Sequence, residues 1–456
     1  MKISRRHFLK AGSLSCGALG LNFFSPMLWN RQLLAADPEL DKKMIFIFQR
    51  GGNDGLNTLI PRGDPDYNTT NRPTLFVPEN QGLDSGNGFA QLHPALQPLM
   101  EIYNKAALNG QAGPGNLAVI HRVGYANQSR SHFDSQQYWE NGVPGNSNLE
   151  EGFIYRHIEH TVNLTDKNNS FVAAALSSSQ MVALKGPKPL PNFEKAADFS
   201  FLGTPAKAQK FLGDLPNASF GTDGAGLLGV YGGPPDQLGK NYRGLVHQTG
   251  QLLGATIETL QNAAAAGNYI PANGAVYPAG SFGAKLQEAA MLFKRTPARV
   301  LGLNIGGWDT HTNQGQINGS QASLLKTLAQ GFQALYRDLQ DQWDKIVIVT
   351  MTEFGRTSIE NGSRGTDHAE SSVMFVGGGG VKGGIYNCDS GNWKQGDMFN
   401  KRGRYLGRLT DFRSVFGEIF TKHFGDDPAL LNDIIPGYKD AAAAIPSDFN
   451  PLGFLG

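Results

Sequence analysis

The chain has 456 residues, with 40 basic, 39 acidic, 58 glycine and two cysteine residues. Residues 1–36 contain five of the basic residues and none of the acidic ones, so the rest of the chain has 35 basic against 39 acidic residues, a net charge of about −4. This charge argues against nucleic acid and anionic lipid as partners. The one cysteine that remains, Cys388, excludes an intramolecular disulfide.

The N-terminal segment has the pattern of a twin-arginine targeting peptide. Residues 4–10, Ser-Arg-Arg-His-Phe-Leu-Lys, precede a weakly apolar run rich in glycine, alanine and serine, which is followed by Leu-Ala-Ala at 34–36. Such a segment is a processed signal and not a membrane span. We expect residues 1–36 to be the signal, with cleavage after Ala36 and an uncleaved anchor as the alternative. The protein is then periplasmic or secreted, with the twin-arginine translocase as its partner during export.

Beyond the signal, five short apolar runs predict buried strands bounded by polar, glycine-containing turns. They are residues 44–48, 117–120, 299–305, 346–349 and 373–376. Helical patterns lie between them, at 93–108, 245–266, 283–293 and 323–343. Alternation of helices with continuously apolar strands is typical of a mostly parallel sheet covered on both faces. The predicted fold class is therefore α/β, with the sheet sandwiched between helices.

Two further segments complete the predicted organisation. From about 185 to 280 the chain is rich in proline and glycine and interrupts the alternation, so we interpret 185–280 as an insertion that forms a cap over the sheet. Residues 411–420 have the pattern of an amphipathic helix whose apolar side packs on the core. We expect a single domain over 43–440, a C-terminal tail at 441–456, and no stable membrane span after the signal is cleaved.

The residues around the strand ends are rich in donors for a metal ion. Ligands of α/β sheets bind beyond the carboxyl ends of the strands. After the first four strands, or directly before the fifth, lie Asp54, Arg130, Ser131, His132, Asp309, His311, Glu353, Arg356, Asp367 and His368. Taken singly, an aspartate after a glycine is more often a turn former or a helix cap. Four of the nine histidines beyond the signal nevertheless lie at strand ends, namely His121, His132, His311 and His368, and together they favour a divalent metal site.

Four motifs carry a resemblance to a known family. They are residues 48–58, 130–140, 306–314 and 352–357, with the sequences FQRGGNDGLNT, RSHFDSQQYWE, GGWDTHTNQ and TEFGRT. Their sequences and spacing resemble the domain of unknown function 1501 family, which is grouped with the alkaline phosphatase and sulfatase superfamily. The resemblance implies an alkaline-phosphatase-like fold, and hydrolysis of phosphate or sulfate esters with divalent metals and a Ser, Thr or modified Cys nucleophile.

The resemblance also implies roles for individual residues. By position, the expected metal ligands are Asp54, Asp309, His311, Glu353, Asp367 and His368. Ser131 is the expected nucleophile, with Ser129 and a water as alternatives, and Arg130 or Arg356 would hold the non-transferring oxygens. The chain departs from the superfamily pattern in its Asp-x-His spacing, in Glu353-Phe354 where Asp-His is usual, and in lacking a Cys-x-Pro-x-Arg sequence. One metal site is therefore expected to be altered or missing.

Together these features predict an exported, metal-dependent hydrolase of phosphate, sulfate or related esters. The substrate would be a small molecule or a polymer that carries such an ester, and zinc, manganese or calcium would be the metal. The alternative is a non-catalytic exported protein that keeps the hydrolase fold and binds glycans, polymers or partner proteins. A redox enzyme is disfavoured, because the chain has no dinucleotide fingerprint, haem motif or cysteine cluster.

Overall fold

The computed structural model describes residues 41–104, 115–199 and 242–456. The expected targeting peptide at 1–36 lies outside the described residues, as do residues 105–108 of the first predicted helix and residues 200–241 of the expected cap.

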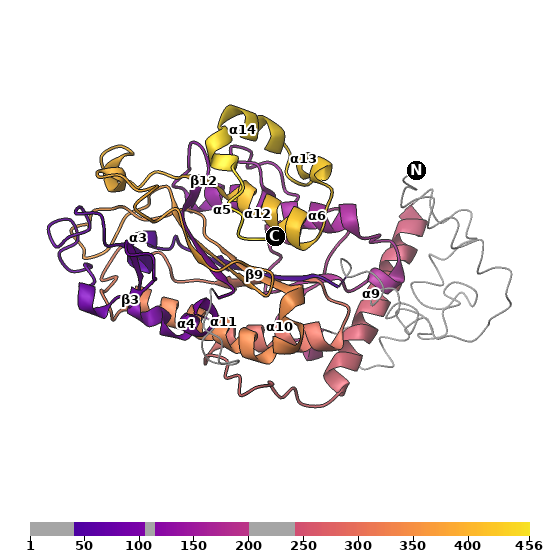
Figure 1. Cartoon of the computed structure of the whole chain (residues 1–456). Coiled ribbons are helices and arrows are strands. Elements are labelled where there is room, and N and C mark those ends of the chain that lie inside the picture. Colours follow the sequence, from indigo (N-terminus) through magenta and orange to yellow (C-terminus); the bar gives the residue numbers. More distant parts are fainter. Residues whose placement is uncertain (1–40, 105–114, 200–241) are drawn as a thin grey trace. The chain divides into compact units, whose positions relative to one another are not determined.

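A nine-stranded mixed sheet forms the centre of the fold (Figure 1), in the order β11-β5-β10-β9-β1-β8-β6-β7 with β12 paired beside β5. The strands are β1 (Lys43–Gln49), β5 (Leu117–Gly124), β6 (Ala173–Leu176), β7 (Asn192–Phe193), β8 (Val300–Ile305), β9 (Ile346–Met351), β10 (Ser372–Gly378), β11 (Gly384–Tyr386) and β12 (Thr410–Asp411). Only β10 runs antiparallel to its neighbours, β5 and β9, and the other pairs are parallel. The predictions of an α/β fold and of a mostly parallel sheet are confirmed.

Two strands were not predicted. β6 pairs with β8 in parallel through Ala173, Ala174 and Ala175, and alanine has a low preference for strands because it lacks a branched or aromatic side chain to pack on the pleated surface. β7 pairs with β6 and lies within the segment expected to form a cap. That segment therefore contributes an edge strand to the sheet.

Side chains alternate between the two faces of the sheet and feed two hydrophobic cores. In β1, Ile45 and Ile47 join one core, whereas Met44, Phe46 and Phe48 join the other, as the two-residue period of a strand requires. The first face is covered by α10 (Ser281–Arg295) and α11 (Ser320–Asp338), and the second by α5 (His132–Asn141), α6 (Phe153–Thr161) and α12 (Phe412–Glu418) (Figure 1). Full burial of one large aliphatic or aromatic side chain stabilises the folded state by roughly 2 kcal/mol.

The remaining elements are mostly short. They are α3 (Gly55–Thr58), α4 (Met100–Tyr103), α9 (Tyr242–Ala265), α13 (Leu431–Ile434), α14 (Tyr438–Ala444) and a small sheet of β2 (Leu59–Pro61), β4 (Ala90–Leu92) and β3 (Leu83–Asp84). The helix predicted from residue 93 is a 3₁₀ segment, Pro94–Leu99, followed by α4. Pro98 lies inside this segment, and its missing N–H disfavours a continuous α-helix. The helix predicted at 411–420 is present as α12, which continues as a π-helix over Ile419–His423.

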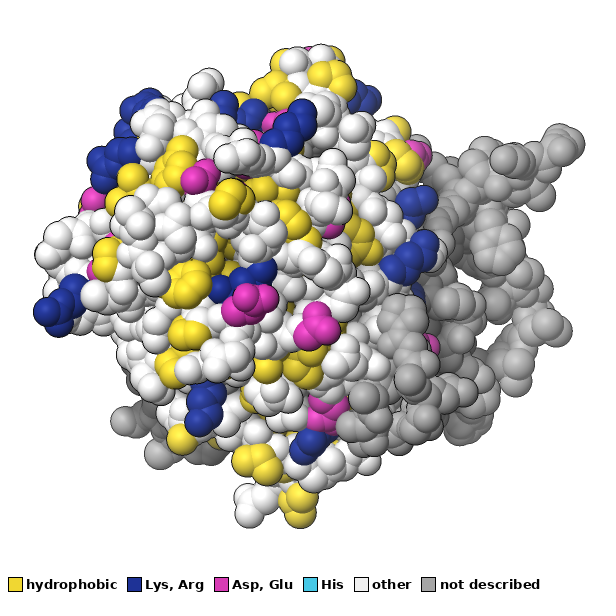
Figure 2. Space-filling model, turned by 60° about the vertical axis from the view of Figure 1, so that its left-hand side comes forward, with side chains coloured by type: hydrophobic (Ala, Val, Ile, Leu, Met, Phe, Trp, Pro, Cys, Tyr) yellow, Lys and Arg dark blue, Asp and Glu magenta, His cyan; other side chains and the backbone are white. Residues whose placement is uncertain are grey.

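The surface mixes charges of both signs. On the face shown in Figure 2, acidic and basic side chains are scattered among polar and hydrophobic ones. Among the described residues, no helix combines the length and the apolar character needed to cross a membrane.

Candidate metal centre

One edge of the sheet collects residues from five separate parts of the chain. The carboxyl ends of the parallel strands β1, β8 and β9 lie at this edge and lead into Gly51, Asp309 and Glu353. Because β10 is antiparallel to β9, the residue His368, which precedes β10, lies at the same edge. His132 joins them as the first residue of α5.

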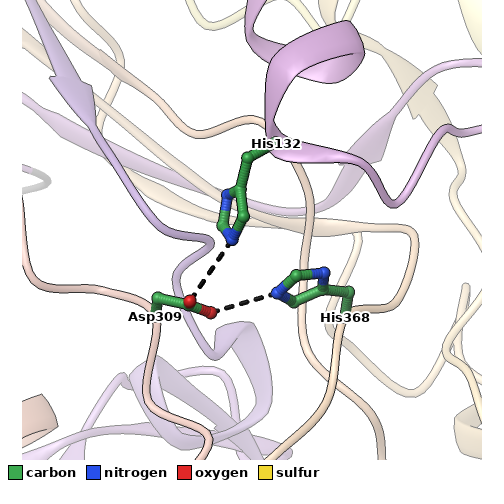
Figure 3. A group of neighbouring side chains, drawn as sticks. All are labelled: His132, Asp309 and His368. Carbon is green, nitrogen blue, oxygen red and sulfur yellow. Dashed lines mark hydrogen bonds and ion pairs between the residues drawn. The ribbon is translucent and has the colours of Figure 1, made fainter.

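Three histidines point their Nε2 atoms at one carboxylate. The Nε2 atoms of His311 and His368 lie 2.9 Å apart, and Asp309 Oδ1 lies 3.2 Å from the first and 3.0 Å from the second. His132 Nε2 lies 3.4 Å from Asp309 Oδ2. Figure 3 shows His132 and His368 approaching Asp309 from different sides, and their ligand atoms all lie within 4.8 Å of one another.

The opposite nitrogen of each of these histidines is held by an acceptor. His132 Nδ1 lies 2.8 Å from Glu353 Oε1, and His311 Nδ1 lies 3.1 Å from Asp367 Oδ1. His368 Nδ1 lies 2.8 Å from the backbone carbonyl of Arg130. Since carboxylates and carbonyls only accept, each Nδ1 carries a proton, and Nε2 is the nitrogen through which each ring can bind a metal when that atom is unprotonated. This is the arrangement by which proteins orient metal-binding histidines. The hydrogen bond to Glu353 raises the pKa of His132.

Phe354 packs the imidazole rings into fixed orientations. Its ring centroid lies 4.8 Å from that of His132 and 4.4 Å from that of His368, and its side chain is fully buried. The rings of His132 and His368 lie 4.5 Å apart, edge to face. Packing and hydrogen bonding therefore fix the same two rings independently.

Arg356 keeps Asp309 ionised. Partial burial alone would raise the pKa of Asp309, but the hydrogen bond from Arg356 and its positive charge outweigh it and lower the pKa to about 2. The Arg356 side chain has no exposed surface, and its guanidinium also donates to the backbone carbonyls of Gly51, Gly52, Trp308 and Thr366. The structure thus places Arg356 against Asp309 and the backbone, away from solvent.

Two glycines allow the turn after β1 to approach this site. A Cβ on Gly51 would lie 2.3 Å from the Asp309 nitrogen, and a Cβ on Gly52 would lie 2.7 Å from the ring of Phe354. Both residues also have positive φ angles, +124° and +88°, which disfavour any residue with a side chain. The Gly51-Gly52 pair is therefore a steric requirement of the site.

Glu353 and Asp367 support the histidines and do not face the shared carboxylate. Glu353 is fully buried, and its Oε1 accepts hydrogen bonds from the Gly51 N–H and Gln136 Nε2, each at 2.8 Å, as well as from His132. Burial would raise the pKa of Glu353, but the hydrogen bonds from His132 and Gln136 outweigh it and lower the pKa. Asp367, which holds His311, is 43% exposed and also pairs with Arg404 at 3.3 Å.

Asp54 occupies a separate buried network. Its carboxylate pairs with Arg72 at 2.8 Å and accepts a hydrogen bond from Gln314 Nε2 at 2.6 Å. It also caps α3 through the Asn57 N–H. Burial would raise the pKa of Asp54, but Arg72 and Gln314 outweigh it and lower the pKa. Within the described residues, no hydrogen bond or ion pair joins Asp54 to the three histidines.

The segment before α5 carries the remaining expected residues. Ser131 is the N-cap of α5, and its hydroxyl accepts from the Asp134 N–H at 3.4 Å. Arg130 donates to the hydroxyl of Tyr405 at 2.5 Å. His132 had been counted among the strand-end histidines but not among the expected ligands, although its position next to Ser131 was a usable signal. The fourth strand-end histidine, His121, is fully buried and packs against Trp393.

One of the comparisons with known proteins gave a match. A family model described as "Protein of unknown function (DUF1501)" matches residues 245–404 and so supports the assignment of the chain to that family. The matched segment contains Asp309, His311, Glu353, Arg356, Asp367 and His368. Neither the curated proteins nor the solved structures gave a match.

Proposed function

We propose that this chain, whose match supports a place in the DUF1501 family, is an exported metal-dependent hydrolase of phosphate, sulfate or related esters. The proposed ligands are His132, Asp309, His311 and His368. The observation that carries the proposal is the convergence of three Nε2 atoms on Asp309 while each Nδ1 is held by an acceptor. The superfamily assignment to the alkaline phosphatases and sulfatases is part of the same proposal and is supported by the mixed α/β sheet.

Two features of the donor atoms fit a cation. His132 Nε2 is buried and has no hydrogen-bond partner in the described part of the chain. A buried polar atom without a partner destabilises the fold unless a ligand or an ion interacts with it. The Nε2 lone pairs of His311 and His368 face each other at 2.9 Å and repel unless a proton or a cation lies between them. One divalent ion would satisfy His132, Asp309 and His368, whose ligand atoms lie within 4.8 Å of one another, and His311 is proposed as a further ligand because its Nε2 lies beside that of His368.

The donor set favours zinc or manganese over calcium. Three imidazole nitrogens and one carboxylate are usual for zinc and for other first-row divalent metals. Calcium prefers six to eight oxygen ligands, and the site offers oxygen only from Asp309 among the proposed ligands. The superfamily pattern of several sites is thus reduced to one in this proposal, because Asp54, Glu353 and Asp367 have other partners.

The residues around the centre can perform the remaining tasks of ester hydrolysis. When bound, the metal would supply Lewis-acid activation of the ester and of its nucleophile at neutral pH. Ser131 is the proposed nucleophile, because its hydroxyl hydrogen is not used in capping α5 and its neighbour His132 is a proposed ligand. The first N–H groups of α5 have no partner within the helix and favour an anionic group. Arg130 is the arginine proposed to hold the non-transferring oxygens, since Arg356 is buried.

Export is included on the pattern of residues 4–10 and 34–36. The twin-arginine route carries folded proteins, so a metal can be inserted before export. The proposed location is the periplasm or the extracellular space, with the twin-arginine translocase as partner during export.

The test is metal analysis of protein exported by its native route, together with a screen of aryl phosphates and aryl sulfates. The wild type is expected to hold about one metal ion per chain and to turn over at least one of these esters. Asp309→Ala and His311→Ala should lose both properties, whereas His160→Ala, which removes an exposed histidine of α6, should keep both. Ser131→Ala should keep the metal and lose turnover.

Two results would contradict parts of the proposal. A wild-type protein that takes up neither zinc nor manganese would remove the metal centre, and the hydrolase with it. Metal that is bound without any ester turnover would favour the alternative, a non-catalytic exported binding protein. The sequestration of Arg356 is the observation on the side of that alternative.

A further inference from the structure

A tight basic hairpin stands out on the surface of the described residues. Lys401 and Tyr405 exchange backbone hydrogen bonds of 3.1 and 2.9 Å, and the Arg404 N–H donates to the Lys401 carbonyl at 3.1 Å. The two central residues, Arg402 and Gly403, have φ angles of 52° and 63°, the signature of a two-residue type I′ turn. We call residues 401–405 the basic hairpin. Lys401, Arg402 and Arg404 are all exposed.

Two side-chain contacts connect the basic hairpin to the candidate metal centre. Arg404 Nη2 lies 3.3 Å from Asp367 Oδ2, and Asp367 holds His311. The Tyr405 hydroxyl accepts from Arg130 at 2.5 Å, and the Arg130 carbonyl holds His368. The hairpin is therefore fixed beside the two groups that orient two of the proposed ligands.

In the part of the chain that the structure describes, two of the three positive charges of this hairpin have no acidic partner, whereas Arg404 pairs with Asp367. The five residues of the hairpin include three cations and no acidic residue. Neither Lys401 nor Arg402 has an acidic partner among the described residues. The adjoining loop adds the exposed Arg364, and Asn361 of that loop donates to both Asp367 and the His311 carbonyl, each at 3.0 Å. The positive charge is thus local to the site, in a chain that is slightly acidic beyond residue 36.

Arg402 also adopts a conformation that arginine seldom takes. A positive φ is uncommon for residues other than glycine and is energetically unfavourable for a residue with a side chain. Such strain persists where the surrounding structure enforces it, and it is concentrated at functional sites. In the basic hairpin it presents a guanidinium at the tip of a rigid turn.

We propose that the basic hairpin and Arg364 bind negative charge that the substrate carries besides the reacting ester, so that the substrate is a polysaccharide bearing several sulfate or phosphate groups. This inference rests on the proposed function and specifies its substrate. Guanidinium groups match the oxygens of sulfate and phosphate in bidentate fashion. Phe133, which follows the proposed ligand His132, is 90% exposed and offers an apolar surface to a sugar ring. Nucleic acid is the competing polyanion and is a separate arm of the experiment.

The experiment measures binding of the exported protein to dextran sulfate, phosphorylated dextran, unmodified dextran and single-stranded DNA at several salt concentrations. The wild type should bind the two charged dextrans and not the unmodified one. The double variant Lys401→Glu/Arg402→Glu should bind them roughly 30-fold more weakly, with a shallower dependence on salt, because two attractions become repulsions. The control Lys167→Glu reverses an exposed lysine that lies before β6, at the opposite end of the parallel strands, and should bind like the wild type.

Thermal unfolding of each variant checks that the fold is kept. Equal binding by the double variant and the wild type would overturn the inference, as would tighter binding of DNA than of dextran sulfate. Binding is measured independently of turnover, so the two proposals fail separately. Protein without metal or turnover that still shows the loss in the double variant contradicts only the hydrolase, whereas turnover without that loss contradicts only the hairpin.

Discussion

Replacing Asp54 with alanine is expected to destabilise the protein strongly while leaving the metal centre in place. Asp54 and Arg72 are both fully buried and pair at 2.8 Å. Arg72 also donates to Asn57 and to the backbone carbonyls of Thr357 and Ser358. Alanine would leave the guanidinium buried without its counter-charge, and breaking a buried pair in this way costs about 3–5 kcal/mol. Loss of the α3 cap adds about 1 kcal/mol.

The assay combines urea unfolding with metal analysis. The free energy of unfolding should fall by about 4–6 kcal/mol, and the fraction of protein that remains folded should keep its metal. The double variant Asp54→Ala/Arg72→Met should recover part of the loss, because it removes the unpaired charge. The variant Asp309→Ala should differ chiefly in its metal content, which should be lost. It removes the acid that pairs with the buried Arg356, so stability should also fall, but by less than in Asp54→Ala, because Asp309 is 46% exposed and Arg356 keeps four backbone carbonyl acceptors. An Asp54→Ala protein of wild-type stability that has lost its metal would refute this reasoning and would restore Asp54 as a ligand.

Three further predictions concern Asp367, Gly51 and two buried histidines. Asp367→Asn should weaken metal binding by about 10–100-fold, because it alters the acceptor that orients His311, and equilibrium dialysis against zinc would show no change if Asp367 is only a surface charge. Gly51→Ala should lower both stability and metal content, because its Cβ would lie 2.3 Å from a backbone nitrogen; a variant with unchanged melting and metal content would contradict the close approach. Burial lowers the pKa of His121 to about 3 and that of His423 to about 4. Below about pH 6.5 these histidines become protonated in the unfolded chain while they stay neutral in the folded protein. Their contribution to stability is complete above about pH 6.5 and falls as the pH drops to about 3 for His121 and to about 4 for His423. At pH 4.5 the free energy of unfolding should be lower by roughly 2.5 kcal/mol per histidine. Equal urea midpoints at pH 7 and 4.5 would argue against both pKa shifts.

Much of the fold could be predicted from local patterns. The five apolar runs appear as β1, β5, β8, β9 and β10, because a strand buried on both faces must be continuously apolar. The alanine run of β6 was missed for lack of branched side chains. The 3₁₀ segment at Pro94–Leu99 departs from the predicted helix because of Pro98.

The sequence also identified the edge of the sheet where chemistry is expected, because residue type and position after a strand are local properties. It could not assign partners to those residues. Asp309, His311 and His368 face one another, whereas Glu353 and Asp367 stand behind the rings. All five had been expected from the sequence to be metal ligands.

What the sequence alone determined is therefore the α/β class, the main strands and the set of polar residues at their ends. Only the tertiary structure decided that Asp54 pairs with Arg72 and that His132 faces Asp309. The physical reason is that the hydrogen-bond partner of a carboxylate depends on which donor the packing of distant loops brings close to it. His132 and Glu353, for example, are 221 residues apart in the chain and 2.8 Å apart in space, and no local pattern encodes that contact.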